Sequence, residues 1–365
     1  MKMTIAKENI IKEIQLAQGV APFEGKSNLP ILSNVLMEVF DDKLKMTASD
    51  LEINLKCELK ANVLEPGSMA LSAKMLSDII REMPPGEITF KTEEEGNKIN
   101  ISNNSVSFYL CGQLGEDFPQ FPQLTDSKSF FLPASILKEM IKKTIFAVSK
   151  DELRPILKGV FLSLSGNKIE MAATDGHRLS VIKQDIDIDF ETPISVIIPT
   201  RAVEELSKIM EEEESVRIDI TEREVGFTSG NIVLISRLIE GDFPNYRSFI
   251  PNEYRTKVKI NRSDFLDACR RISLLSSAII KFSISEGKII INSATSEIGE
   301  ARQELHIDIE GEEIEIGFKP IYVIDGVKNM RGDEIYLTLV SQDKSGVISS
   351  PQEEGYIYLV MPMRI

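Results

Sequence analysis

Apolar residues recur at spacings of three and four in six windows of the chain, which is the pattern of helices with one buried face. The clearest window is 134–149, where Ile136, Leu137, Met140, Ile141 and Ile145 form one stripe. The other windows are 6–19, 73–83, 200–210, 261–275 and 321–331. Apolar and polar residues alternate in stretches such as 87–92, 215–220 and 333–339, which predicts β-strands. The chain is therefore expected to combine helices with antiparallel strands.

Three stretches of the chain share one plan. Residues 29–57, 154–183 and 275–305 each read as a strand, a polar or glycine-containing turn, a second strand and a bend rich in Ser and Thr. The turns place hairpin tips at 41–43, 165–167 and 286–288. A helical window precedes each stretch and a second one follows it, so the repeat includes its flanks.

Two clusters of Gly, Asp, Phe and Pro, at 115–119 and 241–244, are typical of ordered linkers between domains. Together with the repeats they predict three domains, at 1–125, 126–250 and 251–365. Each domain would pack two helices on antiparallel sheets, which is an α+β fold. The order helix, strands, helix, strands within a domain suggests a further twofold repeat, and six such half-units can curve into an arc or a closed ring.

The net charge of −15 at first argues against binding to DNA or to an anionic membrane, because nucleic-acid binders usually present a basic face. The six helical windows nevertheless sum to +4, so the remaining residues carry −19. Much of this excess lies at 93–95, 211–214, 310–313 and 353–354. One interpretation is mixed surface charge that keeps the protein in solution. The other is that the helices face a polyanion and the sheets face outward.

Several classes of protein are disfavoured by what the sequence lacks. Cys57, Cys111 and Cys269 are too far apart for a disulfide framework or a Cys-x-x-Cys metal site. No signal peptide, membrane span, nucleotide-binding loop or metalloprotease motif is present, so a cytoplasmic protein without cofactor or metal is expected. A binding protein is favoured over an enzyme, although Asp175 and His177 leave an unrecognised hydrolase as an alternative.

Four motifs together resemble the bacterial DNA polymerase III β subunit, the sliding clamp, over the whole chain. They are LPIL at 29–32, ATDGHRL at 173–179, GDFPNYR at 241–247 and VMPMRI at 360–365. The resemblance implies a head-to-tail homodimer that closes into a ring, with helices inside and sheets outside. Double-stranded DNA would pass through the ring without sequence readout. The ring would act as a processivity factor in DNA replication that tethers the polymerase without catalysing a reaction, and an ATP-driven clamp loader would open it.

Basic side chains on the helices would then line the DNA-facing surface, since phosphate contacts carry no sequence information and permit sliding. On the helical windows these residues are Lys12, Lys74, Arg81, Lys138, Lys142, Lys143, Arg201, Lys208, Arg270 and Arg271. Lys26, Lys150 and Arg154, which lie outside those windows, are added to the expected DNA-binding set.

The resemblance also implies a groove between the second and third domains that binds short linear motifs. Such motifs come from the polymerase III α subunit, the clamp loader, other polymerases and repair proteins, and they begin with Gln and end in Leu-Phe. Met361 and Met363 suit such a groove, because methionine adapts to several partners. By motif match the groove residues are Leu157, Thr174, Gly176, His177, Arg178, Leu179, Pro244, Phe249, Lys319, Tyr322, Leu359, Met361, Pro362, Met363 and Arg364.

The contact between subunits is matched to Tyr109 in the first domain and to Leu274 and Leu275 in the third. Two leucines at the end of a helix could equally belong to an internal core, and an apolar C-terminal strand could simply fill one. The alternative function is a repeat-built scaffold that binds proteins without encircling DNA.

Overall fold

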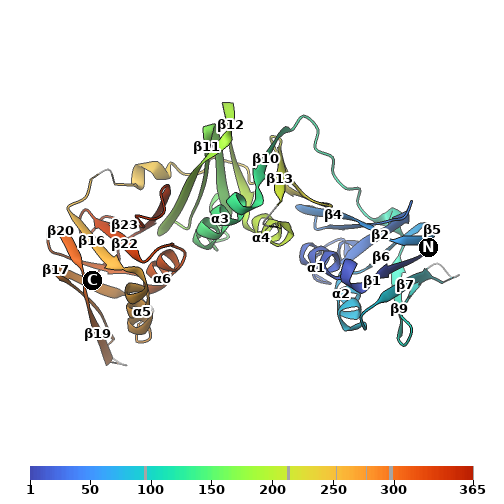
Figure 1. The fold of residues 1–365 in the computed structure, drawn as a ribbon, viewed down its shortest axis with the longest axis horizontal. Coiled ribbons are helices and arrows are strands. Elements are labelled where there is room, and N and C mark those ends of the chain that lie inside the picture. Colours follow the sequence, from blue (N-terminus) through green and yellow to red (C-terminus); the bar gives the residue numbers. More distant parts are fainter. Residues whose placement is uncertain (94–96, 212–213, 252, 277, 296–298, 365) are drawn as a thin grey trace. The chain divides into compact units, whose positions relative to one another are not determined.

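A computed structural model describes all residues except 94–96, 212–213, 252, 277, 296–298 and 365. The described chain forms two compact units (Figure 1). The first unit contains residues 1–138 and 201–238, and the second contains 139–200 and 239–365. Residues of the predicted middle domain occur in both units, and the division into three domains stays a prediction.

The first unit is built on a thirteen-stranded sheet whose strand order is β10-β13-β14-β15-β4-β3-β2-β6-β9-β8-β7-β1-β5. All neighbouring strands whose register is defined run antiparallel. The strands are β1 (Lys2–Ala6), β2 (Asn34–Phe40), β3 (Lys43–Ser49), β4 (Ile53–Lys60), β5 (Asn62–Glu65), β6 (Gly67–Ser72), β7 (Glu87–Thr92), β8 (Lys98–Ser102), β9 (Ser107–Gln113), β10 (Lys128–Pro133), β13 (Ser215–Ile220), β14 (Glu224–Ser229) and β15 (Ile232–Arg237).

Helices α1 (Ile11–Val20) and α2 (Ala73–Glu82) of the first unit pack against each other, and α1 also contacts β3 and β4. The Ser72 side chain caps α2 by accepting a hydrogen bond from the Met75 N–H. Helix α4 (Thr200–Ile209) follows β12 in the chain, and α3 (Ala134–Thr144) has residues in both units. The helix expected over 6–19 begins only at Ile11, because Lys7–Asn9 forms a 3₁₀ turn.

The second unit contains a seven-stranded and a four-stranded sheet, ordered β11-β12-β24-β23-β22-β16-β20 and β19-β18-β17-β21. The strands are β11 (Gly159–Thr174), β12 (Arg178–Pro199), β16 (Thr256–Asn261), β17 (Ile280–Ser285), β18 (Lys288–Thr295), β19 (Gly299–His306), β20 (Asp308–Gly311), β21 (Ile314–Phe318), β22 (Glu334–Leu339), β23 (Gly346–Ser349) and β24 (Tyr356–Val360). Helices α5 (Arg262–Ser273) and α6 (Pro320–Lys328) pack together, and the Asn261 side chain caps α5 by accepting a hydrogen bond from the Asp264 N–H.

The hairpin predictions have mixed outcomes. Asp41-Asp42 and Glu286-Gly287 are two-residue hairpin turns, as expected. The turn expected at 165–167 is wrong, because β11 continues through it and pairs with β12 on both sides of it. Gly166, with a φ of 57°, instead lies between two register shifts, at each of which β12 contains the extra residues. The bend predicted around residue 296 lies outside the described residues.

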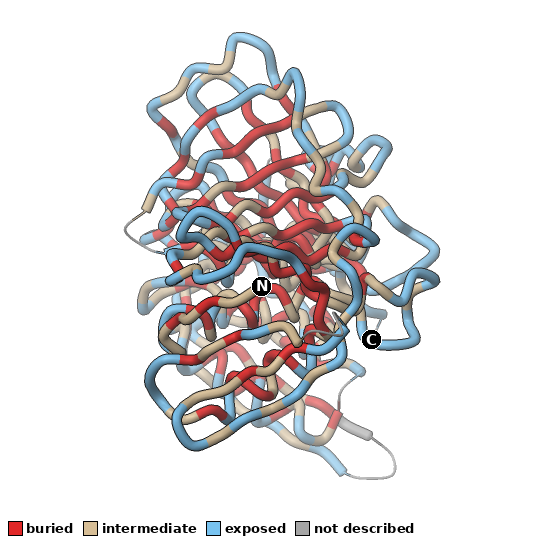
Figure 2. Tube along the Cα trace, turned by 90° about the vertical axis from the view of Figure 1, so that its right-hand side faces the viewer, coloured by how far each residue is buried: buried red, intermediate tan, exposed pale blue. Residues whose placement is uncertain are grey.

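Burial follows the strands and helices, while the turns between them are exposed (Figure 2). The Phe265, Phe282 and Phe318 rings fill the core between α5 and the four-stranded sheet. The Phe282 ring centroid lies 5.5 Å from that of Phe265 and 5.7 Å from that of Phe318. Within the described residues, no helix is both long and apolar enough to cross a membrane.

Candidate functional site

An apolar cavity of about 250 Å³ opens on the second unit beside β24. Its walls come from the turn between β11 and β12, from the segment after residue 241 and from the C-terminal strand. The lining residues are Arg154, Leu157, Thr174, Gly176, Arg178, Leu179, Pro244, Tyr246, Phe249, Leu359 and Met361. Nine of these lining residues were expected in the groove by motif match, and the structure brings them together here. The other two are Arg154 and Tyr246.

The turn at 174–178 is shaped by its own side chains. The Thr174 hydroxyl accepts a hydrogen bond from the Gly176 N–H at 3.1 Å. One Asp175 carboxylate oxygen accepts from the N–H groups of His177 and Arg178, at 2.9 and 3.0 Å. Gly176 has a φ of 88°, which a residue with a side chain rarely adopts. These local hydrogen bonds explain why this run of residues turns here and presents Arg178 to the cavity.

Arg178 joins several elements around the cavity. Its guanidinium donates to Asp175 at 3.0 Å, to Asp325 at 2.6 Å and to the Phe146 carbonyl at 2.5 Å. The same group lies 4.8 Å from the centre of the Tyr322 ring, within cation–π range. The hydrogen bonds hold the side chain in one position, so Arg178 forms a fixed wall of the cavity.

The segment after residue 241 is anchored by a buried carboxylate. Glu170 accepts hydrogen bonds from the Tyr246 hydroxyl and from Arg247, and it pairs with Lys183 at 2.8 Å. Burial raises the pKa of Tyr246 above its usual range, so the hydroxyl remains a donor to Glu170. The Phe243 ring stacks on Phe161 with centroids 4.9 Å apart. This anchoring places Pro244, Tyr246 and Phe249 along the cavity.

The C-terminal strand supplies the opposite wall. Leu359 pairs with Leu179 in the β12–β24 register, and the Met361 N–H donates to the His177 carbonyl at 2.8 Å. The Met363 N–H donates to the Gly317 carbonyl at 2.8 Å. Pro362, Met363 and Arg364 continue the chain past the cavity and do not line it.

A second cluster adjoins the cavity around Tyr322. The His177 and Tyr322 rings are nearly parallel, with centroids 6.3 Å apart. The Lys319 ammonium lies 4.9 Å from the same ring. This cluster adjoins the cavity because Arg178, a lining residue, contacts the Tyr322 ring. The cluster residues His177, Lys319 and Tyr322 do not line the cavity themselves.

The hydrolase alternative finds no support in this geometry. Asp175 and Thr174, the polar neighbours of His177, direct their hydrogen bonds to the backbone of the turn and to Arg178. Within the described residues, no Ser, Thr or Cys hydrogen-bonds to the His177 ring, which a nucleophile–base pair would require. His306, at the end of β19, is exposed.

The expected DNA-binding residues fall into two groups. Within the described residues, Lys74, Lys142 and Lys150 are exposed and have no carboxylate within ion-pair distance. Lys26 is exposed and lies over the Phe23 ring, and Lys138 is half-buried. The residues with side-chain partners are Lys12 with Glu211, Arg81 with Asp78, Arg201 with Asp50, Lys208 with Glu205, Arg270 with Asp267 and Arg271 with Gln303.

Burial excludes one basic residue from the expected surface, and another lines the apolar cavity. Lys143 is only 3% exposed and pairs with buried Glu353, so its assignment to a DNA-facing surface is wrong. Arg154 is exposed and lines the apolar cavity. Tyr246, a cavity residue that the motif match missed, stands two positions after the expected Pro244, and its hydroxyl is bonded to Glu170.

The residues expected at a subunit contact lie on the surface. Tyr109 on β9 is 68% exposed and Leu274, just after α5, is 83% exposed, while Leu275 is half-buried. An internal core position is therefore wrong for Leu274. Strand β9 pairs with β8 along residues 107–111, and only Gly112 and Gln113 pair with β6, so most of its other edge is open. Strand β19 is the edge of the four-stranded sheet.

The described chain thus packs pairs of helices on antiparallel sheets and opens an apolar cavity beside the C-terminal strand. Models of the DNA polymerase III beta subunit match the chain three times, as the N-terminal domain at residues 1–122, the central domain at 131–245 and the C-terminal domain at 247–364. The chain belongs to this family, the beta sliding clamps.

Relatives agree over the full length. The beta sliding clamp of Bacillus subtilis (strain 168) is 31% identical, with 100% of both chains covered, and that of Chlamydia muridarum is 30% identical over 100% of this chain and 99% of the relative. The crystal structure of the Bacillus subtilis clamp superposes with a TM-score of 0.95, covering 100% of this chain and 99% of that one. A Pseudomonas aeruginosa clamp bound to griselimycin gives 0.95 at 29% identity, with 100% of both chains covered.

Proposed function

We propose that two copies of this chain close head to tail into a ring that encircles duplex DNA and tethers the replicative polymerase. The observation that carries this proposal is the match to all three family domains along almost the entire chain. The matched ranges also support clamp domains at 1–125, 126–250 and 251–365. The ring performs no chemical step, and it works in the cytoplasm with the chromosome.

Contact with DNA in this proposal is weak and general. The exposed and unpaired Lys74, Lys142 and Lys150 are the strongest candidates for phosphate contacts. Those residues already paired with carboxylates, such as Lys12 and Arg270, would exchange a side-chain partner for a phosphate. A topological link needs no tight binding, and contacts to phosphate alone allow the ring to slide.

The apolar cavity beside β24 is the proposed docking site for client motifs that end in Leu-Phe. Burying a Leu and a Phe side chain would contribute about 1.5–3 kcal/mol each, before ordering costs. Such modest affinity permits clients to exchange, which a shared tether requires. The cluster of His177, Lys319 and Tyr322 would contact the part of the motif that precedes the two apolar residues.

The open edges of β9 and β19 are the proposed contact between subunits. An exposed edge strand presents unpaired backbone groups and readily pairs with another chain. Each ring would contain two such contacts, both joining the first unit of one copy to the second unit of the other. Tyr109 and Leu274 would then be covered.

We expect the protein at micromolar concentration to give a mass near twice 40.9 kDa in native mass spectrometry. Tyr109→Lys with Leu274→Lys should yield monomer, because the substitutions place charges in an apolar contact. Phe40→Lys, which changes another exposed apolar side chain, is the matched control and should remain dimeric. A monomeric wild-type protein would contradict the proposed ring.

The encircling of DNA is tested by topology. After loading by a clamp loader with ATP, we expect the protein to stay on nicked circular DNA during gel filtration and to be lost once the circle is linearised. A scaffold that binds proteins without encircling DNA would not be retained on either form. Equal retention on circular and linear DNA would also contradict encirclement. Binding that does not weaken as salt rises would exclude the proposed phosphate contacts.

A further inference from the structure

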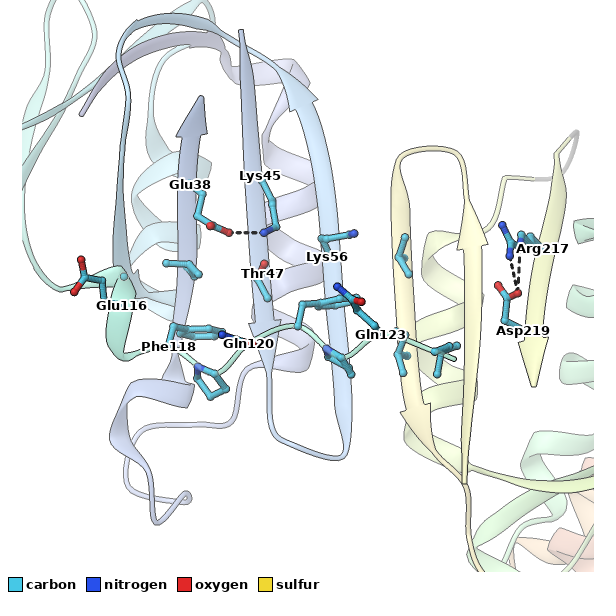
Figure 3. A pocket seen from close by; sticks show the side chains of 18 residues that line it. Glu38, Lys45, Thr47, Lys56, Glu116, Phe118, Gln120, Gln123, Arg217 and Asp219 are labelled. Carbon is cyan, nitrogen blue, oxygen red and sulfur yellow. Dashed lines mark hydrogen bonds and ion pairs between the residues drawn. The ribbon is translucent and has the colours of Figure 1, made fainter. Parts of the chain in front are cut away.

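A larger cavity, of about 690 Å³, lies on the first unit and takes no part in the proposed function (Figure 3). Its floor is the outer face of the sheet, where β2, β3, β4 and β15 are neighbours. One side is formed by the segment 115–124, which crosses these strands. We refer to residues 119–124 as the strap.

The strap is held by side chains and not by its backbone. Phe118, just before the strap, is buried. The Leu124 side chain packs directly on Gly226, where a Cβ atom would lie only 2.5 Å from it. Within the described residues, the N–H groups of Gln120, Phe121, Gln123 and Leu124 make no hydrogen bond in the structure. The strap is thus an extended segment whose backbone is free to pair with another chain, as in β-strand addition.

The floor of the cavity contains an unsatisfied hydroxyl. Thr47 is 3% exposed, and its hydroxyl has no hydrogen-bond partner among the residues that the structure describes. A buried polar group without a partner is unfavourable, so such groups in native proteins call for an explanation. Thr47 lines the cavity, as the close-up shows, and a bound group could supply the missing partner.

A lysine is the cross-strand neighbour of this threonine. Lys56 on β4 pairs with Thr47 in the strand register, so the two side chains lie on the same face of the sheet. The Lys56 ammonium lies 5.1 Å from the Phe121 ring of the strap, and no carboxylate of the described residues pairs with it. The other cations of the cavity are already neutralised, because Lys45 pairs with Glu38 at 2.7 Å and Arg217 with Asp219 at 2.9 Å.

A hydroxyl donor next to an unpaired ammonium suits a carboxylate. A polyanion such as a nucleic acid is a poorer fit, because Glu38, Glu116 and Asp219 also line the cavity. Leu36, Val233 and Ile235 flank the Thr47–Lys56 pair with apolar surface. An extended peptide places every second side chain on one face, so it could direct apolar, acidic and apolar side chains into the cavity together.

We propose that this cavity binds an extended segment of a partner protein, in which an Asp or Glu lies between two apolar residues at alternate positions. The carboxylate accepts from Thr47 and Lys56, and the peptide backbone pairs with the strap. This site lies entirely within the first unit and is independent of the docking site beside β24.

The probe is the synthetic peptide acetyl-Leu-Ser-Asp-Ser-Leu-amide, titrated into the full chain labelled at Thr, Leu, Val and Ile methyl groups for NMR. We expect shifts at Leu36, Thr47, Val233 and Ile235 that saturate with the peptide. Replacing the Asp of the probe by Asn should weaken binding about tenfold, because hydrogen bonds to a charged acceptor are the stronger ones.

Two variants and a control test the assigned contacts. Thr47→Val keeps the side-chain shape and should weaken binding of the probe about fivefold. The same substitution should raise the melting temperature of the protein, because the unsatisfied hydroxyl is gone. Lys56→Gln should weaken it about tenfold. Lys98→Gln, at an exposed position of β8 outside the cavity, should leave the dissociation constant unchanged.

Opposite effects of Thr47→Val on stability and on binding separate a ligand contact from a purely structural role. Binding that is unchanged in both variants would overturn the proposal, as would shifts confined to Leu157 and Leu179 of the other cavity. An absence of shifts at millimolar probe would also overturn it. Stronger shifts with a six-residue oligothymidylate than with the peptide would assign the site to nucleic acid and reject the peptide.

Discussion

Lys143→Met is expected to lower the free energy of unfolding of the second unit by about 3–5 kcal/mol, the usual effect of removing one partner from a buried ion pair. The Lys143 ammonium and the Glu353 carboxylate are both almost fully buried and form a hydrogen-bonded ion pair. The Lys143 ammonium also lies 4.2 Å from the centre of the Tyr356 ring. With Met at 143, the Glu353 carboxylate would remain buried, and the exposed Arg331, 3.9 Å away, would be its one remaining cation among the described residues.

The expected loss of stability comes mainly from leaving the Glu353 charge buried without its partner, and less from any net stabilisation by the intact ion pair. Burial lowers the pKa of Lys143, and Glu353 offsets only part of that shift, so holding the charge there is unfavourable. One Glu353 oxygen has no hydrogen-bond partner in the described part of the chain, which makes the buried charge still less favourable. The double variant Lys143→Met with Glu353→Leu should therefore return to within about 1 kcal/mol of the wild type.

Urea unfolding followed by far-UV circular dichroism measures these changes. Lys158→Met is the matched control, because it removes a Lys from an exposed pair with Glu152, 2.6 Å apart. Such surface pairs contribute about 0–1 kcal/mol. A loss from Lys143→Met no greater than that from Lys158→Met would show that burial does not set the strength of the pair.

Secondary structure was predictable where the periodicity of apolar residues in a short stretch fits one kind of element. The strands at 87–92 and 215–220 follow from the alternation of apolar and polar residues, and the structure confirms them. The turn expected at 165–167 failed because Ser, Gly and Asn occur both in turns and where strand pairing is interrupted. Only the pairing of β11 with a second long strand distinguishes the two, and that pairing joins residues far apart in sequence.

The groove was predictable from motifs, but the roles of its charged residues were not. The run from Thr174 to Arg178 shapes its own turn, so its position follows from local sequence. Lys143 and its exposed neighbour Lys142 carry the same charge in the same helical window. Lys143 is nevertheless buried, because Glu353, 210 residues later in the sequence, supplies a partner. Arg154 faces an apolar cavity that forms only when distant segments meet. Charge counted along a helix therefore overestimates the basic surface.

Met361→Lys is expected to weaken binding of a peptide ending in Leu-Phe by about 100-fold. Met361 lines the apolar cavity and is 38% exposed, so a Lys can reach solvent in the free protein and the fold should persist. Its N–H bond to the His177 carbonyl involves only the backbone and is kept. A bound peptide would cover the cavity, lose the apolar contact worth about 1.5–3 kcal/mol, and enclose part of the ammonium.

Calorimetric titration of the peptide into both proteins gives the two dissociation constants. Leu64→Lys, which changes an exposed apolar side chain of β5 in the first unit, is the control and should bind like the wild type. Unchanged circular dichroism would show that Met361→Lys is folded. Equal affinity for Met361→Lys and the control would remove Met361 from the docking site and leave β24 a purely structural strand. A loss confined to Met361→Lys would instead assign the exposed apolar surface of the C-terminal strand to client binding, because both variants add the same charge.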